Sequence, residues 1–405
     1  MCRGCLVADQ PSTLRLVFPE VYLEDEDSEA RIADINSSMA QYLDDGVLVA
    51  QEQGFMLVDR KTSHAPSRKG LVVALDLDAY DYRPGTKTMI RATEGTIVDR
   101  LPPRIRVREN AGVELPHIMV LIDDPEQTVI EPLFAADLEL AYDFELMQES
   151  GHLRGWKVSQ QALLEQVGSA LGRLAEKERF QQRYGVDDDE VMLYAMGDGN
   201  HSFATAKAIW EQLKSEASDP ADVMDHPARY ALVELVNVHD PGLEFEAIHR
   251  VIFDADVDDL LAKADDYYRQ AGTPCCVEWF DDLAAANVAA KASASAHAIP
   301  LVAAGRYGLL KIVEPTLTLE VATLQNFLDD YLQGCSKARI DYIHGEEAVT
   351  RFGRQQGNIG FYLPSISKHD LFRTIVRDGA LPRKTFSMGE ADEKRFYLEA
   401  RRITR

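Results

Sequence analysis

The chain has 405 residues, of which 46% are hydrophobic and 27% are charged, and its formal net charge at pH 7 is −24. This length gives room for two or three domains, and the composition is that of a globular protein in water. The negative charge repels nucleic-acid backbones, so we expect no nucleic-acid partner. Any phosphate site therefore has to be a local basic pocket.

Cysteines and apolar runs exclude further classes. The five cysteines have neither disulfide nor zinc spacing, and Cys2 and Cys5 lack the second pair that a zinc site would need. The sequence has no apolar run of about 18 residues and no signal-peptide core near its start. We expect a cytoplasmic protein without a membrane segment, and the oligomeric state stays open.

Three regions follow one another along the chain, and together they predict a mixed α+β (α/β) fold. The first, 1–150, is strand-rich, with predicted strands at 14–18, 55–59, 71–75, 105–107, 118–121 and 129–131. The second, 151–255, has predicted helices at 159–184, with Ser159 as N-cap, and at 200–214, and predicted strands at 191–196, 230–238 and 245–253. The third, 256–405, is α/β, with predicted helices at 258–271, 321–332, 346–356 and 368–376 and predicted strands at 276–279, 301–304, 309–313, 359–362 and 395–398.

The ten residues from Gly197 to Ala206 are the most informative stretch. They join a predicted strand to a predicted helix, where unsatisfied N–H groups and the positive helix end attract an anion. Asp198 ends the strand, as catalytic or metal-binding carboxylates often do, and Gly199 permits a positive φ. The predicted phosphate-binding residues here are Gly199, Asn200, Ser202, Thr205 and Lys207. The alternative is a tight turn whose polar side chains only cap the helix.

Basic residues elsewhere supply candidate partners for that anion. Five arginines fall within the 18 residues 91–108, among them Arg91 and Arg104, and arginine binds phosphate through paired donors. The alternative there is a surface strand with paired charges. His249 and Arg250 point to opposite faces of a predicted strand, so His249 is also read as a core histidine. The loop 381–389 either closes over an anion or leads into the last strand.

These motifs resemble a known family in the same order along the chain. The stretch from Gly197 to Ala206 is similar to the Asp-Gly-His-His-Arg box of the family called domain of unknown function 1015. Residues 236–243 with 248–251, 342–348, 382–385 and 91–94 are similar to further motifs of that family. The resemblance implies that Arg250, Lys384 and Thr385 join the phosphate site. It also implies that Glu94 is catalytic beside Asp198 and His201.

The same box resembles a turn in the ParB/sulfiredoxin superfamily, which includes free-serine kinases. In those proteins the turn opens a helix and holds nucleotide phosphates. The resemblance implies a nucleoside triphosphate or diphosphate with Mg²⁺, and a ParB/sulfiredoxin-like strand–turn–helix in the central region. Ser202 stands where the family has an arginine, so another arginine or Lys207 has to replace that cation.

The function predicted from these residues is phosphoryl transfer to a small hydroxylated metabolite, serine-like by the resemblance. Asp198 acts as general base or Mg²⁺ ligand, residues 199–202 bind phosphate oxygens, and His201 donates to a phosphate or leaving oxygen. Arg91 or Arg104 neutralises the developing charge. Three alternatives remain: a phosphoester hydrolase at the same site, a non-catalytic nucleotide-binding regulatory module with a protein partner, and an α+β protein whose turn only caps a helix.

Overall fold

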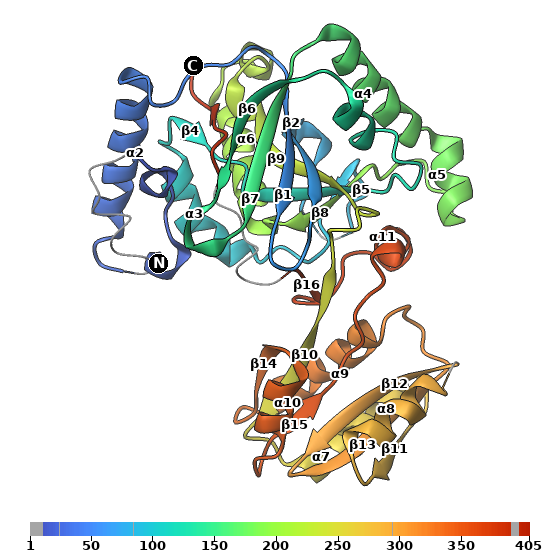
Figure 1. Cartoon of the computed structure of the whole chain (residues 1–405). Coiled ribbons are helices and arrows are strands. Elements are labelled where there is room, and N and C mark those ends of the chain that lie inside the picture. The colour runs from blue at the N-terminus through green and yellow to red at the C-terminus, as the bar shows by residue number, and fades with distance from the viewer. Residues whose placement is uncertain (1–10, 24, 84, 294, 390–396) are drawn as a thin grey trace. The chain divides into compact units, whose positions relative to one another are not determined.

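The computed structural model describes residues 11–389, except 24, 84 and 294, and residues 397–405. The chain forms two compact units (Figure 1). The first comprises Met1–Leu243 and Gly389–Arg405, and the second comprises Glu244–Met388. The sequence predicted three regions. Strands of the first two pair in a single sheet, but residues 244–255 of the second region belong to the second unit and residues 389–405 of the third region belong to the first unit.

The first unit contains five helices and ten strands among its described residues. The helices are α2 (Ser28–Asp44), α3 (Leu101–Arg108), α4 (Gln161–Leu174), α5 (Lys177–Tyr184) and α6 (Asn200–Glu216). The strands are β1 (Phe55–Lys61), β2 (Arg68–Asp76), β3 (Ile90–Arg91), β4 (Val113–Glu114), β5 (Ile118–Ile122), β6 (Glu139–Glu145), β7 (His152–Val158), β8 (Tyr194–Asp198), β9 (Tyr230–Asn237) and β17 (Arg401–Arg402).

Eight of these strands form the sheet that positions the candidate site, in the order β3-β8-β5-β9-β2-β1-β7-β6. β3 is parallel to β8 and β5 is parallel to β9, whereas β5 and β8 are antiparallel. One face carries the main core, in which Leu71, Val120 and Leu235 of the sheet pack with Val167 of α4 and Phe203 of α6. The apolar faces of α4 and α6 therefore fix these helices on the sheet.

The second unit is a smaller α/β body. Its elements are β10 (Phe245–Phe253), α7 (Val257–Gln270), β11 (Cys275–Phe280), α8 (Leu283–Lys291), β12 (Ala296–Ala303), β13 (Arg306–Val313), α9 (Glu320–Gly334), β14 (Arg339–His344), α10 (Glu346–Gly353), β15 (Ile359–Phe361), α11 (Leu371–Asp378) and β16 (Phe386–Met388). The strand order is β11-β13-β12-β15-β10-β14, and β16 pairs with β10. Leu260, Leu301 and Leu324 belong to the core between this sheet and helices α7 and α9.

The mixed α+β fold is confirmed, but several predicted elements are wrong. Residues 14–18 contain a 3-10 helix, Thr13–Leu16, and the predicted strand 105–107 lies inside α3, which begins with two prolines at positions that favour a helix start. Residues 129 and 130 form a buried bend, and Glu131 begins a 3-10 helix, Glu131–Ala135. The Val129 N–H donates to the Asp124 carboxylate instead of to a neighbouring strand.

Two further predictions concern the helix at 159–184 and the chain ends. That helix is two helices, α4 and α5, and Gln160 rather than Ser159 stands at the N-cap of α4. Cys2 and Cys5, and residues 395 and 396 of the predicted strand 395–398, lie outside the described residues, and Tyr397 and Leu398 are not in a strand. In the described part of the chain, the helices are either too short or too polar to cross a membrane.

Candidate functional site

The strand–turn–helix predicted around Asp198 is present. β8 ends at Asp198, Gly199 has φ 86° and ψ 24°, and α6 begins at Asn200. The first intrahelical bond runs from the Phe203 N–H to the Gly199 carbonyl at 2.9 Å, and the N-cap residue, Gly199, makes no side-chain cap. The N–H groups of the first turn therefore point out of the helix end, as an anion site requires.

Gly199 is required for two separate reasons. Its φ lies in the left-handed region, which is unfavourable for residues with a Cβ. A Cβ built there would lie 3.1 Å from both Cα and Cγ1 of Ile118, at the start of β5. The turn therefore packs so closely against β5 that a side chain at position 199 would be crowded by Ile118. The Gly199 N–H donates to Asp198 Oδ1 at 2.8 Å.

A second segment, 93–97, is bonded to this turn at both of its ends. The Thr93 hydroxyl donates to the Met196 carbonyl at 2.6 Å, and Asn200 Nδ2 donates to Thr93 Oγ1 at 3.5 Å. The Ile97 N–H donates to His201 Nε2 at 3.3 Å. Glu94 belongs to this segment, so its backbone lies between two residues that are bonded to Asn200 and His201.

The polar side chains of the first turn of α6 differ in what they can do. Asn200 Oδ1 is buried and has no hydrogen-bond partner among the described residues, so it is an acceptor in need of a donor. The Thr205 hydroxyl is 2% exposed and donates to the His201 carbonyl at 2.7 Å, which makes it a structural group. Ser202 is half-buried on the same turn.

The two arginines predicted to bind phosphate are engaged away from the turn. Arg91 is buried, and its guanidinium donates to the carbonyls of Thr88 and Glu190 at 3.1 and 2.8 Å. Burial also lowers the pKa of Arg91. Arg104 donates to the Arg100 carbonyl at 2.7 Å and pairs with Glu20, so its place on α3 ties it to that neighbourhood.

Lys207 is likewise engaged along its own helix. Its ammonium group lies 2.6 Å from Glu211 and 4.0 Å from Asp78, two turns beyond the start of α6. The predicted cation is therefore turned toward acidic neighbours. The prediction that Arg91, Arg104 or Lys207 replaces the missing arginine at Ser202 finds no support in these contacts.

Arg250, Lys384 and Thr385 belong to the second unit. Arg250 is fully buried and donates to Gln325 Oε1 and to the carbonyls of Ile248, Arg383 and Lys384 at 2.7 to 3.1 Å. The Thr385 hydroxyl donates to the Pro382 carbonyl at 2.7 Å. Arg250 thus binds the loop that leads into β16. This agrees with the alternative in which residues 381–389 lead into a strand rather than close over an anion.

His249 is a core histidine, the alternative that the sequence left open. It is 5% exposed, and its Nδ1 accepts the Leu363 N–H at 3.0 Å. Burial, with the charges of His344 and Arg250, lowers its pKa to about 4. A neutral, hydrogen-bonded imidazole is therefore part of the packing of the second unit.

Sequence reasoning missed a cluster at the other end of β5. Asp123, which follows β5, accepts hydrogen bonds from Arg183 and the Tyr184 hydroxyl at 2.5 Å and from His239 Nε2 at 2.6 Å. It also missed His117, next to the start of β5, which is exposed between buried neighbours. The signal that could have identified His117 is its position as a histidine inside an apolar run.

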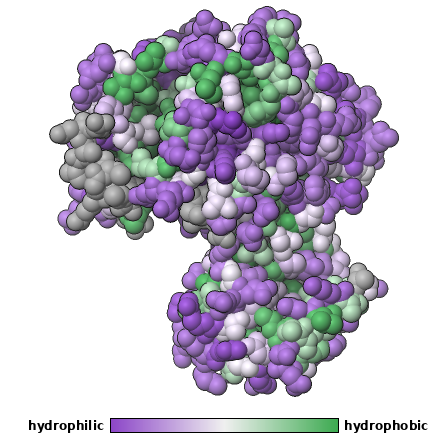
Figure 2. Space-filling view, viewed as in Figure 1, coloured by the Kyte–Doolittle hydropathy of each residue, from purple (hydrophilic) through white to green (hydrophobic). Residues whose placement is uncertain are grey.

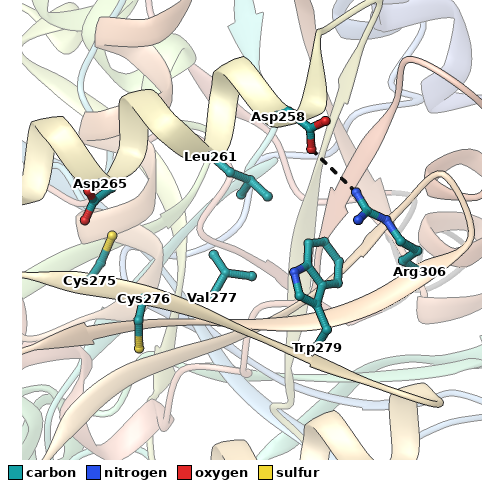
Figure 3. Close-up of a pocket in the computed structure, with 8 residues that line it drawn as sticks. All are labelled: Asp258, Leu261, Asp265, Cys275, Cys276, Val277, Trp279 and Arg306. Atoms are coloured by element: carbon teal, nitrogen blue, oxygen red, sulfur yellow. Dashed lines mark ion pairs between the residues drawn. The ribbon is translucent and has the colours of Figure 1, made fainter.

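A pocket of about 460 Å³ lies in the second unit, between α7 and the edge strand β11 (Figure 3). The Arg306 guanidinium lies 4.3 Å from the centre of the Trp279 ring and 3.6 Å from Asp258. The face of the Trp279 ring is therefore already covered by Arg306. Cys275 points toward Asp265 and Cys276 points away from it (Figure 3). The alternation of strand side chains thus prevents the two thiols from acting together.

The surface and the donor set limit what the first unit binds. Figure 2 shows hydrophilic residues over most of the visible face, with hydrophobic residues in separate groups. Among the described residues no three carboxylate, imidazole or thiol groups gather to enclose a metal. A Mg²⁺ ion at Asp198 would therefore need phosphate oxygens and water as its other ligands, which is how Mg²⁺ commonly binds.

The two units, each a sheet covered by helices, define a mixed α+β protein. The family model described as "Protein of unknown function (DUF1015)" matches residues 2–331, and the chain belongs to this family. No curated protein matches the chain.

Solved structures with similar folds have low identity. A free serine kinase mutant in complex with ADP is 11% identical, with 82% of this chain and 92% of that chain covered and a TM-score of 0.43. A conserved hypothetical protein from Pyrococcus furiosus is 13% identical, with 82% and 95% covered and a TM-score of 0.40. SbnI with a C-terminal truncation, from Staphylococcus aureus, is 9% identical, with 79% and 83% covered and a TM-score of 0.39. At these scores the similarities define neither a ligand nor an activity for this chain.

Proposed function

We propose that this protein is a phosphate- or nucleotide-binding enzyme of the phosphoryl-transfer type that acts on a small hydroxylated metabolite. The observation that carries the proposal is the uncapped start of α6 directly after Asp198, with Gly199 held against Ile118. Phosphoryl transfer depends mainly on positioning and on charge stabilisation, which N–H groups and a helix dipole supply. The motif resemblance supports a serine-like acceptor.

Each polar group at the turn has a part in this proposal. The Gly199 N–H donates to Asp198, so the N–H groups of residues 200–202 bind phosphate oxygens in this proposal, and the buried Asn200 Oδ1 accepts a hydrogen bond from the ligand. Asp198 binds Mg²⁺, which neutralises phosphate charge when it is present. Glu94, in the segment bonded to Asn200 and His201, orients the acceptor hydroxyl.

A phosphoester hydrolase is the second candidate, and the engagement of the arginines favours it. Arg91 and Arg104 direct their donors at protein carbonyls and at Glu20. A site with few cations suits one phosphate group better than three, because less negative charge has to be neutralised. Both candidates use the same helix end and differ in the ligand that binds.

A thermal-shift titration tests the proposal and separates the two candidates. The protein is titrated with ATP, ADP, CTP, inorganic phosphate and phosphoserine, each with and without Mg²⁺, because a ligand of the native state raises the melting temperature. A rise with a nucleotide that Asp198→Asn diminishes supports phosphoryl transfer. A rise with phosphate or phosphoserine alone supports the hydrolase, and no rise with any ligand contradicts both.

A further inference from the structure

His117 is an exposed residue in a segment that is otherwise buried or half-buried. Within residues 113–124, all of which the structure describes, the neighbours Leu115 and Ile118 are 8% and 2% exposed. The His117 side chain is therefore accessible to solvent, although the residues on either side of it are buried. A histidine that serves packing alone would be enclosed as His249 is.

The pairing of β5 with β8 places His117 beside the phosphate turn. Met119 lies opposite Asp198 in the antiparallel register, and Ile118 contacts Gly199. His117 is the next residue toward the start of α6.

The hydrogen bonding of His117 indicates which of its ring nitrogens carries the proton. Nδ1 lies 3.3 Å from the Leu115 carbonyl oxygen, which only accepts hydrogen bonds. Nδ1 therefore carries the proton, and Nε2 holds the lone pair. A backbone carbonyl orients many functional histidines in this way.

Although part of the His117 ring reaches solvent, the protein atoms packed around the rest of it favour the neutral imidazole. This desolvation lowers the pKa of His117 most strongly, and the charge of Arg108 of α3 lowers it further. Asp198 of β8 and Glu114 of β4 raise it, and so does the hydrogen bond to the Leu115 carbonyl, but the net direction is down. At neutral pH the imidazole is thus ready to accept a proton.

We propose that His117 is the general base of this site, a role that rests on the proposed phosphoryl-transfer function. Nε2 takes the proton of the acceptor hydroxyl while that oxygen bonds to the terminal phosphorus of a nucleoside triphosphate. The bridging P–O bond breaks, and its electron pair stays on the nucleoside diphosphate. Asp198 is then left to bind Mg²⁺ rather than to act as base.

The test follows the histidine side chains of the intact chain by ¹⁵N NMR during titration with ATP and Mg²⁺. Nε2 of His117 is expected to be unprotonated at pH 7 and to shift on ATP addition. His152 on β7, which pairs with Asp143 and Glu145, is expected to stay unchanged. If His201 shifts and His117 does not, the nucleotide binds at the turn but this inference is overturned. If neither shifts at saturating ATP, the proposed function fails and the inference fails with it.

A kinetic comparison uses His117→Gln, with His152→Gln as the matched control. His117→Gln is expected to keep the Kd for ADP within twofold of wild type and to slow ATP turnover with L-serine by about 100-fold, the lower end of general-base effects. It should also remove the acid limb of the pH–rate profile, which a merely structural role would not do. A wild-type turnover rate in His117→Gln overturns the inference.

Discussion

The Ile97 N–H donates a hydrogen bond to Nε2 of His201 at 3.3 Å. A ring nitrogen that accepts a hydrogen bond carries no proton, so Nδ1 is the nitrogen of His201 that donates. The imidazole therefore joins the segment 93–97 to α6 as well as lying at the candidate site. Substitution of His201 would disturb both, which makes Gly199 and Asp198 sharper probes of the turn.

Gly199→Ala is expected to destabilise the first unit more than Gly46→Ala does. Both glycines have positive φ, 86° and 69°, and alanine in that region costs about 1–2 kcal/mol. At Gly46 a Cβ meets nothing within 4 Å, whereas at Gly199 it meets Ile118 at 3.1 Å. We expect a total loss of about 3 kcal/mol for Gly199→Ala, measured by urea unfolding. Equal losses for the two variants would show that β5 does not constrain the turn.

Asp123→Ala is expected to cost about 3 kcal/mol of unfolding free energy, because it leaves three donors at a buried site without their acceptor. Asp123 is 9% exposed and accepts from Arg183, Tyr184 and His239. The control is Asp225→Ala, whose side chain is 83% exposed in its pair with Arg405 and is expected to change stability by less than about 0.5 kcal/mol. Similar effects of the two variants would contradict the network.

The second unit is expected to lose stability as the pH falls from 6.5 to 4. The unfolded chain protonates His249 near its ordinary pKa of 6.5, whereas burial lowers the pKa of the folded state to about 4. Between these values the unfolded state binds the extra proton, so the loss is about 1.4 kcal/mol per pH unit, roughly 3 kcal/mol in all. Above pH 6.5 this group has no effect.

Hydrogen exchange of the β10 amides at a series of pH values measures this loss. His249→Asn places an acceptor near the Nδ1 position for the Leu363 N–H and removes the titration. Its profile is expected to be flatter between pH 6.5 and 4. A slope equal to that of wild type would assign the pH dependence to other groups.

Glu114 gives the first unit an acid-sensitive contact of its own. Burial raises the pKa of Glu114, but Arg108 and Arg401 more than offset this and lower it below the ordinary value of 4.5. The stabilisation is therefore present above pH 4.5 and is lost as the pH falls through the folded-state pKa. Glu114→Gln is expected to weaken acid dependence in urea unfolding, whereas Glu29→Gln, at an exposed pair with Arg106, should not.

The sequence predicted the turn because its signals are local. A glycine followed by polar residues and an apolar helical pattern identifies the start of α6, and the apolar run 245–253 matches β10 in both bounds. The prediction missed β6 although Leu140, Tyr142 and Phe144 alternate along Glu139–Glu145, a strand that is almost entirely exposed. The sequence predicted a strand at 105–107, whereas Pro102 and Pro103 stand in the first turn of α3, where proline favours a helix start.

The cationic part of the site was not predictable in the same way. The partners of Arg91 include the Glu190 carbonyl, which lies 99 residues further along the chain. The strand order that places His117 beside Gly199 also depends on pairing between distant segments. Such contacts follow from tertiary packing and cannot be inferred from residue type. The arginines in 91–108 suggested a basic pocket, whereas in the structure Arg91 and Arg104 bind backbone carbonyls and Glu20.

The most direct test of the account is a calorimetric titration of ADP with Mg²⁺ into wild type, Gly199→Ala and Gly46→Ala, at a temperature at which all three are folded. The account predicts that wild type and Gly46→Ala bind with the same Kd. It predicts that Gly199→Ala binds at least tenfold more weakly, because its N–H groups are displaced from the phosphate. The same Kd for all three, or no binding to wild type, would contradict a phosphate site at the start of α6.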